Sequence, residues 1–196
     1  MAEILFQGHG SLRMMTNHHT VIYIDPYAGE GYDVPADIIL VTHQHSDHNQ
    51  IELVPQKEDC VIIQNMQAIK DNAYQSFEIK DVKVKAVAAY NGNHVKEECV
   101  GYIVYADDKK IYFAGDTSKI KEMEILKEEH LDIAFYPIDG VYNMNPAEAT
   151  ECADMIAAKV SIPVHMLPGA LFLEGKAKLF TAKSAKILPA GESVKV

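Results

Sequence analysis

The sequence feature that most restricts the fold is the apolar run IILV at 38–41, which leads directly into the polar segment THQHSDH at 42–48. An uninterrupted apolar run of this length indicates a strand that is covered on both faces. We expect this strand to end at the polar segment and a helix to begin there, over about residues 47–54. A chain of this kind requires layers of sheet and helix, with the histidines where strand and helix meet.

Further short segments with strand and helix patterns occupy the rest of the chain. DDKK at 107–110 is typical of a hairpin turn between two strands. An amphipathic helix is expected over 119–130 after Thr117 and Ser118, both acceptable N-caps, and Pro146 stands at the start of the next helix. We expect strands over 3–7, 11–16, 20–25, 36–43, 60–65, 74–79, 82–90, 99–106, 109–116, 133–137, 162–165 and 192–196, and helices over about 47–54, 119–130, 146–159 and near 176–183.

The order of these segments predicts the fold class. Strands come first as an antiparallel meander, and later they alternate with helices in each half of the chain. This order indicates two sheets packed face to face with helices outside, a four-layer αββα sandwich within the α/β class, although a three-layer α/β fold would give a similar string. At 196 residues, we expect a single domain that spans 1–196.

Charge composition narrows the class of partner. The formal net charge is −10, and Arg13 is the only arginine among the 18 basic residues. An acidic surface repels phosphate backbones, and arginine is the usual residue for bidentate phosphate recognition. We therefore expect a small-molecule substrate and no nucleic acid. No apolar run approaches the roughly 20 residues of a membrane helix, so no membrane partner is expected, and the oligomeric state is left open.

The cysteines and the N-terminal segment bear on the cellular compartment. Cys60, Cys99 and Cys152 are an odd number, widely spaced, and form no CxxC pair. This pattern argues against a disulfide framework and against a thiolate zinc site, and it predicts reduced core thiols. The segment MAEILFQGHG lacks the order of a secretory signal, so we expect a cytoplasmic location.

The histidine cluster has a spacing that suits metal binding. His43 and His45 are two residues apart on an extended segment, so both side chains point the same way and can reach one ion. Asp47 and His48 follow after the chain has turned, so they can reach a second position nearby. Imidazole and carboxylate are common ligands of zinc-like ions. A run of surface or core histidines is the alternative, but the full HxHxDH pattern at a strand end favours metal.

This pattern resembles the defining motif of the metallo-β-lactamase fold superfamily, and the resemblance extends across nearly the whole chain. The chain looks most like the small, stand-alone bacterial and archaeal metal-dependent hydrolases of that superfamily, the group that includes the ascorbate-6-phosphate lactonase type. The matching segments occur in the order that the family uses: GHGSLRM at 8–14, IDPY at 24–27, ADIILVTHQHSDH at 36–48, AYNGNH at 89–94, YFAGDT at 112–117, YPIDGVYNMNPAEA at 136–149 and IPVH at 162–165.

The resemblance implies a complete set of ligands for two divalent ions, with zinc favoured and manganese, iron and nickel left open. Taken alone, the later histidines could be ordinary loop residues, and the aspartate of GDT could cap a helix. The implied ligands are His43, His45 and His94 for the first ion, Asp47, His48 and His165 for the second, and Asp116 as a bridge, with Asp47 and Asp116 also as catalytic residues.

The implied reaction is hydrolysis. Two ions about 3.5–4 Å apart lower the pKa of a shared water to near 7, and a nearby carboxylate can orient the resulting hydroxide or accept its proton. An ester, lactone, amide or phosphoester of a small molecule is the expected substrate. The alternatives are a phosphodiesterase or ribonuclease, a non-catalytic metal-binding sensor, and a redox diiron protein.

Several residues near the motif have no assigned role. His9 lies in a Gly-His pair that the family also shows near the site, so a supporting role and a loop position are both open. Asp139 stands where many relatives carry a small or apolar residue, and we expect it to alter the pocket floor. Tyr142 and Asn143 follow in a loop that either contacts substrate or packs against the fold.

Overall fold

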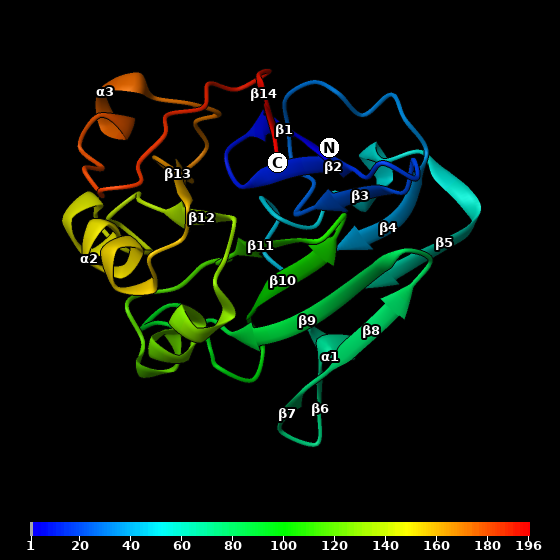
Figure 1. The fold of residues 1–196 in the computed structure, drawn as a ribbon, viewed down its shortest axis with the longest axis horizontal. Helices are drawn as coiled ribbons and strands as arrows, with labels where there is room; N and C mark the ends of the chain where they lie inside the picture. Colours follow the sequence, from blue (N-terminus) through cyan, green and yellow to red (C-terminus); the bar gives the residue numbers. More distant parts are fainter. Residues whose placement is uncertain (1) are drawn as a thin grey trace.

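The computed structural model describes residues 2–196, and its main feature is a pair of facing β-sheets (Figure 1). The first sheet contains β1 (Glu3–Gly8), β2 (Ser11–Met15), β3 (Val21–Ile24), β4 (Ala36–Leu40), β5 (Gln56–Ile63) and β14 (Ser193–Lys195). The second contains β8 (Ser76–Ile79), β9 (Val82–Ala88), β10 (Val100–Ala106), β11 (Lys109–Phe113), β12 (Ile133–Pro137) and β13 (Val160–Val164). The remaining elements are the hairpin β6 (Ile69–Lys70) and β7 (Ala73–Tyr74), the α-helices α1 (Asn65–Ala68), α2 (Pro146–Ile156) and α3 (Glu174–Ala177), and the 3-10 helices η1 (Ile51–Leu53) and η2 (Lys121–Glu129).

The directions of the strands place many strand ends at one edge of the sandwich. The first sheet has the order β14-β1-β2-β3-β4-β5, with β1 to β3 antiparallel and β3 to β5 parallel. The second has the order β13-β12-β11-β10-β9-β8, with β8 to β11 antiparallel and β11 to β13 parallel. Consequently β1, β3 and β4 share one direction, as do β9, β11, β12 and β13. The residues that follow each of these sets gather at a common edge of its sheet.

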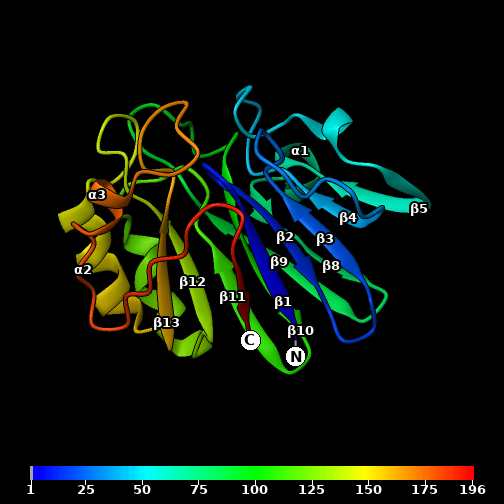
Figure 2. The same cartoon turned by 90° about the horizontal axis from the view of Figure 1, so that it is seen from above.

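The alternation of side chains along the strands builds the core. Ile133 and Phe135 of β12 point between the sheets, where Phe135 stacks on Phe113 with ring centroids 5.2 Å apart. Ala134 and Tyr136 point to the outer face, which α2 and η2 cover (Figure 2). Each large apolar side chain buried in this way stabilises the fold by about 1.5–3 kcal/mol. The second sheet is therefore apolar on both faces, which its continuous apolar strands require.

The outer face of the first sheet is covered by loops and a short 3-10 turn. Tyr23 and Ile39 pack there against Tyr32 and Val34 of the loop after β3 and against Val54 beside η1. The predicted four-layer α/β sandwich is confirmed, with little regular helix in this outer layer. The last strand, β14, pairs with β1, so the two ends of the described chain lie side by side (Figure 2).

Two predicted helices differ from the structure. The helix expected over 47–54 is wrong, because only η1 forms there and the backbone N–H of Gln50 donates to Pro26 instead of to a preceding helical turn. The segment expected over 119–130 is the 3-10 helix η2. Its buried residues Met123 and Leu126 are three positions apart, which suits three residues per turn better than 3.6.

The expected caps of η2 are also wrong. Ile120 occupies the N-cap position, and no side chain caps the helix. The Thr117 hydroxyl donates to the carbonyl of Tyr90 instead, which ties the end of β11 to the loop after β9. The last predicted helix lies slightly earlier than expected, at α3, with Phe180 packed under it in the core.

The smaller predictions agree with the structure, except that Cys60 is not a core residue. Asp107 and Asp108 have positive φ values of 52° and 59°, as a tight β-hairpin turn requires, and they join β10 to β11. The cysteines are free: Cys99 and Cys152 are buried, whereas Cys60 is partly exposed. Over residues 2–196, no helix combines the length and the apolar character needed to cross a membrane.

Candidate metal centre

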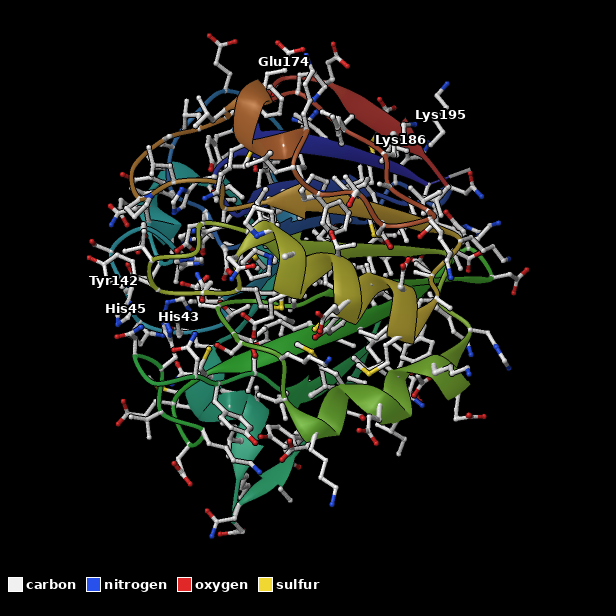
Figure 3. All side chains as sticks on the ribbon, turned by 90° about the vertical axis from the view of Figure 1, so that its left-hand side faces the viewer. His43, His45, Tyr142, Glu174, Lys186 and Lys195 are labelled. Carbon is white, nitrogen blue, oxygen red and sulfur yellow. The ribbon has the colours of Figure 1, made fainter. Side chains whose placement is uncertain are left out.

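The seven predicted ligands converge at the edge where the aligned strands of both sheets end. The His43–His48 segment follows β4, and His94 follows β9. Asp116 and His165 follow β11 and β13. Figure 3 shows His43 and His45 at this edge, with Tyr142 of the loop after β12 beside them. Residues separated by up to 122 positions in the sequence are thus brought together because their strands run in the same direction.

His43, His45 and His94 form a compact histidine group. One ring nitrogen from each lies within 4.8 Å of the others. His94 Nε2 is 3.2 Å from His45 Nδ1, and the His43 and His94 rings stand edge to face with centroids 4.8 Å apart. His43 and His94 are buried, whereas His45 is exposed. The group therefore reaches solvent through His45.

Asp47, His48 and His165 form a second group, which also includes His9. Their ligand atoms lie within 4.8 Å of one another. His165 Nε2 is 3.8 Å from Asp47 Oδ2, and the His48 and His165 rings are nearly parallel. Asp47 is the partly exposed member, and the three histidines are buried. His9 was left open by the sequence and here contacts Asp47 directly.

Asp116 lies between the two groups. Its Oδ1 is 3.4 Å from His48 Nε2, and its Oδ2 is 3.2 Å from His94 Nε2. The same Oδ2 is 3.6 Å from His165 Nε2 and 4.0 Å from His43 Nε2. A single buried carboxylate thus faces histidines of both groups. This is the arrangement that a bridging ligand requires.

The backbone before Asp116 accepts only glycine. Gly115 has a φ of 64°, and a Cβ at this position would lie 2.6 Å from the carbonyl oxygen of Val100. A contact under 3 Å with backbone cannot be relieved by moving a side chain. The glycine therefore lets β11 end in a sharp turn that directs Asp116 into the site.

Besides Nδ1 of His165, three buried imidazole nitrogens in this centre have no hydrogen-bond partner among residues 2–196. They are Nε2 of His43, Nε2 of His48 and Nε2 of His165. Leaving a buried polar atom unpaired costs about 1–3 kcal/mol, so such atoms in a native fold need an explanation. All three lie within about 4 Å of Asp116. Neutral imidazole nitrogens around a carboxylate are a suitable donor set for zinc-like ions.

The opposite ring nitrogen of each buried histidine ligand lies within 3.0 Å of an oxygen atom of the fold. Such contacts fix the ring orientation and the tautomer, and they are typical of histidines that bind metal. Thr42 links two of them, because its hydroxyl donates to Asp25 Oδ2 at 2.7 Å and can accept from His43. The contacts are His43 Nδ1 to Thr42 Oγ1 at 3.0 Å, His48 Nδ1 to Asp25 Oδ2 at 2.8 Å, His94 Nδ1 to Asn91 Oδ1 at 2.9 Å and His165 Nδ1 to Asp139 Oδ2 at 3.0 Å. The angle of the His165–Asp139 contact lies outside that of a regular hydrogen bond.

The electrostatics of the centre favour an ionised carboxylate among histidines. Burial alone would raise the pKa of Asp116, but His48 and His165 outweigh it and hold that pKa well below its usual range. Burial and the neighbouring His48 lower the pKa of His43 to about 2. Burial also acts to lower the pKa of His165, but Asp116, Asp139 and Asp47 raise it to about 10. His43 is thus neutral, the form in which imidazole binds metal.

The sequence assigned no role to Asp25, Thr42 or Asn91, which support the histidines. Asp25 stands in the IDPY segment and Asn91 in AYNGNH, so both lie in the quoted motifs. Their contacts depend on long-range geometry, since Asp25 and His48 are 23 residues apart. Only the Thr42–His43 contact could have been predicted from the sequence, because a hydroxyl residue directly precedes the first histidine of the motif.

The loop after β12 contains Asp139, Tyr142 and Asn143, and their contacts differ. Asp139 lies beside His165, and its Oδ1 accepts hydrogen bonds from the backbone N–H groups of Val141 and Tyr142. Asn143 is buried and donates to Asp139 Oδ2 at 2.8 Å, so it packs within the loop. Tyr142 is half exposed and lines a cavity beside the histidines.

Comparisons with known proteins agree with this geometry. Residues 3–165 match the family described as β-lactamase superfamily domain. A UPF0173 metal-dependent hydrolase of Lysinibacillus sphaericus is 30% identical over 192 residues, which cover 83% of this chain and 84% of that protein. A crystal structure from Parabacteroides distasonis superposes with a TM-score of 0.77 at 30% identity and covers 94% of this chain and 91% of that one. Igni18, a metallo hydrolase from Ignicoccus hospitalis, shares the fold with a TM-score of 0.75 at 21% identity, over 98% of this chain and 97% of that one.

Proposed function

The chain belongs to the β-lactamase superfamily and, within it, to the metal-dependent hydrolases, and from this premise we propose that it hydrolyses a small molecule with a dinuclear metal centre. The substrate bond is an ester, lactone, amide or phosphoester. The proposal includes the two-ion stoichiometry and zinc as the favoured metal. It excludes nucleic acid as a substrate, because the chain is acidic and has one arginine.

One observation carries the proposal: three buried Nε2 atoms that have no hydrogen-bond partner among residues 2–196 surround the Asp116 carboxylate. If these histidines had a purely structural role, nothing would offset the free-energy cost of burying their unpaired nitrogen atoms. We assign His43, His45 and His94 to the first ion, Asp47, His48 and His165 to the second, and Asp116 to both. When bound, the two ions would supply a hydroxide nucleophile at neutral pH and polarise the reacting carbonyl or phosphoryl group.

The residues of the chain then position the reactants. Asp116 is buried and ionised, so it holds negative charge between the two histidine groups. Asp47 is partly exposed at the mouth of the centre, where it can accept a proton from the nucleophile or return one to a leaving group. Asp25, Asn91 and Asp139 orient the histidine rings, so the ligand nitrogens stay directed at Asp116.

The proposal is tested by metal analysis beside a substrate screen. Elemental analysis of the purified protein should find about two equivalents of a divalent metal per chain. The loaded protein should then turn over at least one class among lactones, acyl esters and phosphoesters, and chelation should abolish that turnover. Stoichiometric metal without any turnover would favour the sensor alternative, and intense visible colour with iron would favour the redox alternative. Absence of retained metal would contradict the centre itself.

We also propose a cytoplasmic location. The cysteines are free, and Cys99 and Cys152 are buried in the core. Free core thiols are typical of a reducing compartment. Fractionation of the native host followed by immunodetection would test this location.

A further inference from the structure

A cavity of about 470 Å³ lies beside the first histidine group and has an unusual lining. Apart from the histidines, it is lined by Gln44, Asn65, Asn93, Val95, Glu98 and Cys99, and we call it the amide cavity. Its volume suits a small ligand. Because His43, His45 and His94 form one wall, a molecule that reacts at the metal centre can extend into this space.

The amide cavity is lined by groups that recognise uncharged polar atoms. A carboxamide offers both hydrogen-bond donors and an acceptor, so it suits amide, hydroxyl and ester groups. Gln44 is fixed in place, because its Nε2 uses both hydrogens, on Gln64 Oε1 at 2.8 Å and on Asn65 Oδ1 at 2.9 Å, so toward a ligand it can act only as an acceptor. Asn49 donates to Gln44 Oε1 at 3.3 Å. The wall is therefore a network of connected carboxamides.

Among residues 2–196, no lysine or arginine lines the amide cavity or the neighbouring cavity of about 500 Å³ beside Tyr142. Lys96 lies on the same loop as Asn93, but its Nζ is 2.5 Å from Glu122 Oε1 and 5.0 Å from the centre of the Tyr90 ring. Recognition of a phosphate or carboxylate normally uses such cations. Within the described part of the chain, the one charged side chain that lines the amide cavity besides the predicted ligands is the carboxylate of Glu98.

We propose that the amide cavity selects a substrate whose non-reacting part carries hydrogen-bonding groups and no negative charge, with Glu98 as the residue that disfavours anions. This inference rests on the proposed hydrolytic metal centre and narrows its substrate class. It disfavours a substrate with a phosphorylated non-reacting part, because a phosphate group carries a charge of about −1.5 to −2 at neutral pH and would meet Glu98 with no lysine or arginine to offset the repulsion.

The test compares two hydroxamates with the same metal-chelating head. Butyrohydroxamate has an uncharged tail, whereas succinyl monohydroxamate ends in a carboxylate. Calorimetric titration of the zinc-loaded protein measures their affinities without requiring turnover. We expect the succinyl compound to bind more weakly by at least about threefold, the scale of repulsion between two unit charges roughly 6 Å apart in water. Glu98→Gln should abolish this difference.

Glu97→Gln is the matched control, because Glu97 is exposed on the same loop but does not line the amide cavity. This variant should keep the wild-type preference. Equal or tighter binding of the succinyl compound to the wild type would overturn the inference, as would an unchanged preference in Glu98→Gln. Failure of both hydroxamates to bind zinc-loaded protein would instead overturn the accessible metal centre of the proposed function, so the two failures are distinguishable.

Discussion

His9 Nε2 lies 3.2 Å from Asp47 Oδ2, and the His9 ring packs on the His165 ring with centroids 3.8 Å apart. The His9 side chain is fully buried, and its Nδ1 lies 3.2 Å from the carbonyl oxygen of Ala170. A carbonyl oxygen can only accept, so Nδ1 donates this hydrogen bond. His9 thus links the loop after β1 to the loop after β13 and holds two predicted ligands of the second ion.

His9→Asn should weaken binding of the second metal ion by about 10- to 100-fold, the usual effect of losing a residue that orients a ligand. The His9 backbone has a left-handed φ of 57°, which asparagine tolerates. Chelator competition with zinc-loaded protein measures the affinity. His19→Asn is the control, because His19 also has a left-handed φ of 62° but is exposed. Equal metal retention in the two variants would show that His9 has no positioning role.

Asp25→Asn should also loosen the second ion. The Asp25 carboxylate lies 2.8 Å from His48 Nδ1 and accepts from both the backbone N–H and the hydroxyl of Thr42 at 2.7 Å. Asparagine keeps the shape but removes the charge that orients His48, so we expect metal affinity about 10- to 100-fold lower. Circular dichroism verifies the fold beside the affinity measurement. Unchanged affinity in a folded variant would contradict the orienting role.

Asp116→Ala should keep the fold but reduce metal content from about two ions toward one. Among the described residues, Asp116 is the only carboxylate that lies within 4.0 Å of all four buried histidines His43, His48, His94 and His165. Its loss should lower the hydrolytic rate by at least about a hundredfold, as expected for a positioned catalytic group. Elemental analysis and turnover are compared with wild type and His19→Asn. Two tightly held ions with normal turnover would eliminate the bridging role.

Metal removal should lower the melting temperature. An ion that binds only the folded state stabilises it by about 4 kcal/mol when its concentration is a thousand times the dissociation constant. Stripping the centre also leaves His43, His48 and His165 with unpaired buried nitrogens. Differential scanning calorimetry with and without chelator measures the shift, and added zinc should reverse it. Identical melting after verified removal would argue against a high-affinity site.

Asp37 should make stability depend on pH. Burial alone would raise its pKa, but Lys57, Lys80 and the backbone N–H of Val21 outweigh burial and lower it. A carboxyl with a lowered folded pKa stabilises the protein above its unfolded pKa of about 4, and this stability is lost as the pH falls through the folded value. We expect Asp37→Asn to cost about 1–3 kcal/mol of unfolding free energy at pH 7 and less at pH 3, measured by urea denaturation.

Asp33→Asn is the control for Asp37, because the Asp33–Arg13 ion pair is largely exposed on the aspartate side. Solvent screens an exposed pair, so it contributes little to stability and this variant should stay near wild type at both pH values. An equal loss at pH 7 and pH 3 for Asp37→Asn would show that its charge does not carry the effect.

The sequence by itself predicted the strands of the two main sheets and the fold class, but not the hairpin of β6 and β7, and it supplied the residues of the proposed metal centre. These signals are local or periodic: the IILV run predicts β4, and His43 and His45 share a face because side chains alternate along a strand. The resemblance to the metallo-β-lactamase superfamily added His94, Asp116 and His165, which lie far from the motif in sequence. The structure brings them together because β9, β11 and β13 end at the same edge.

Only the tertiary structure decided how these residues are supported and what surrounds them. Asp25 and His48 are 23 residues apart, and His9 and Asp47 are 38 apart, so no local pattern predicts either contact. The helix expected at 47–54 is absent because Gln50 bonds to Pro26, a partner that the fold supplies. Local propensity and periodicity indicate which secondary-structure elements a segment favours. Contacts between distant segments depend instead on how the two sheets pack, and this packing determines which residues line the amide cavity.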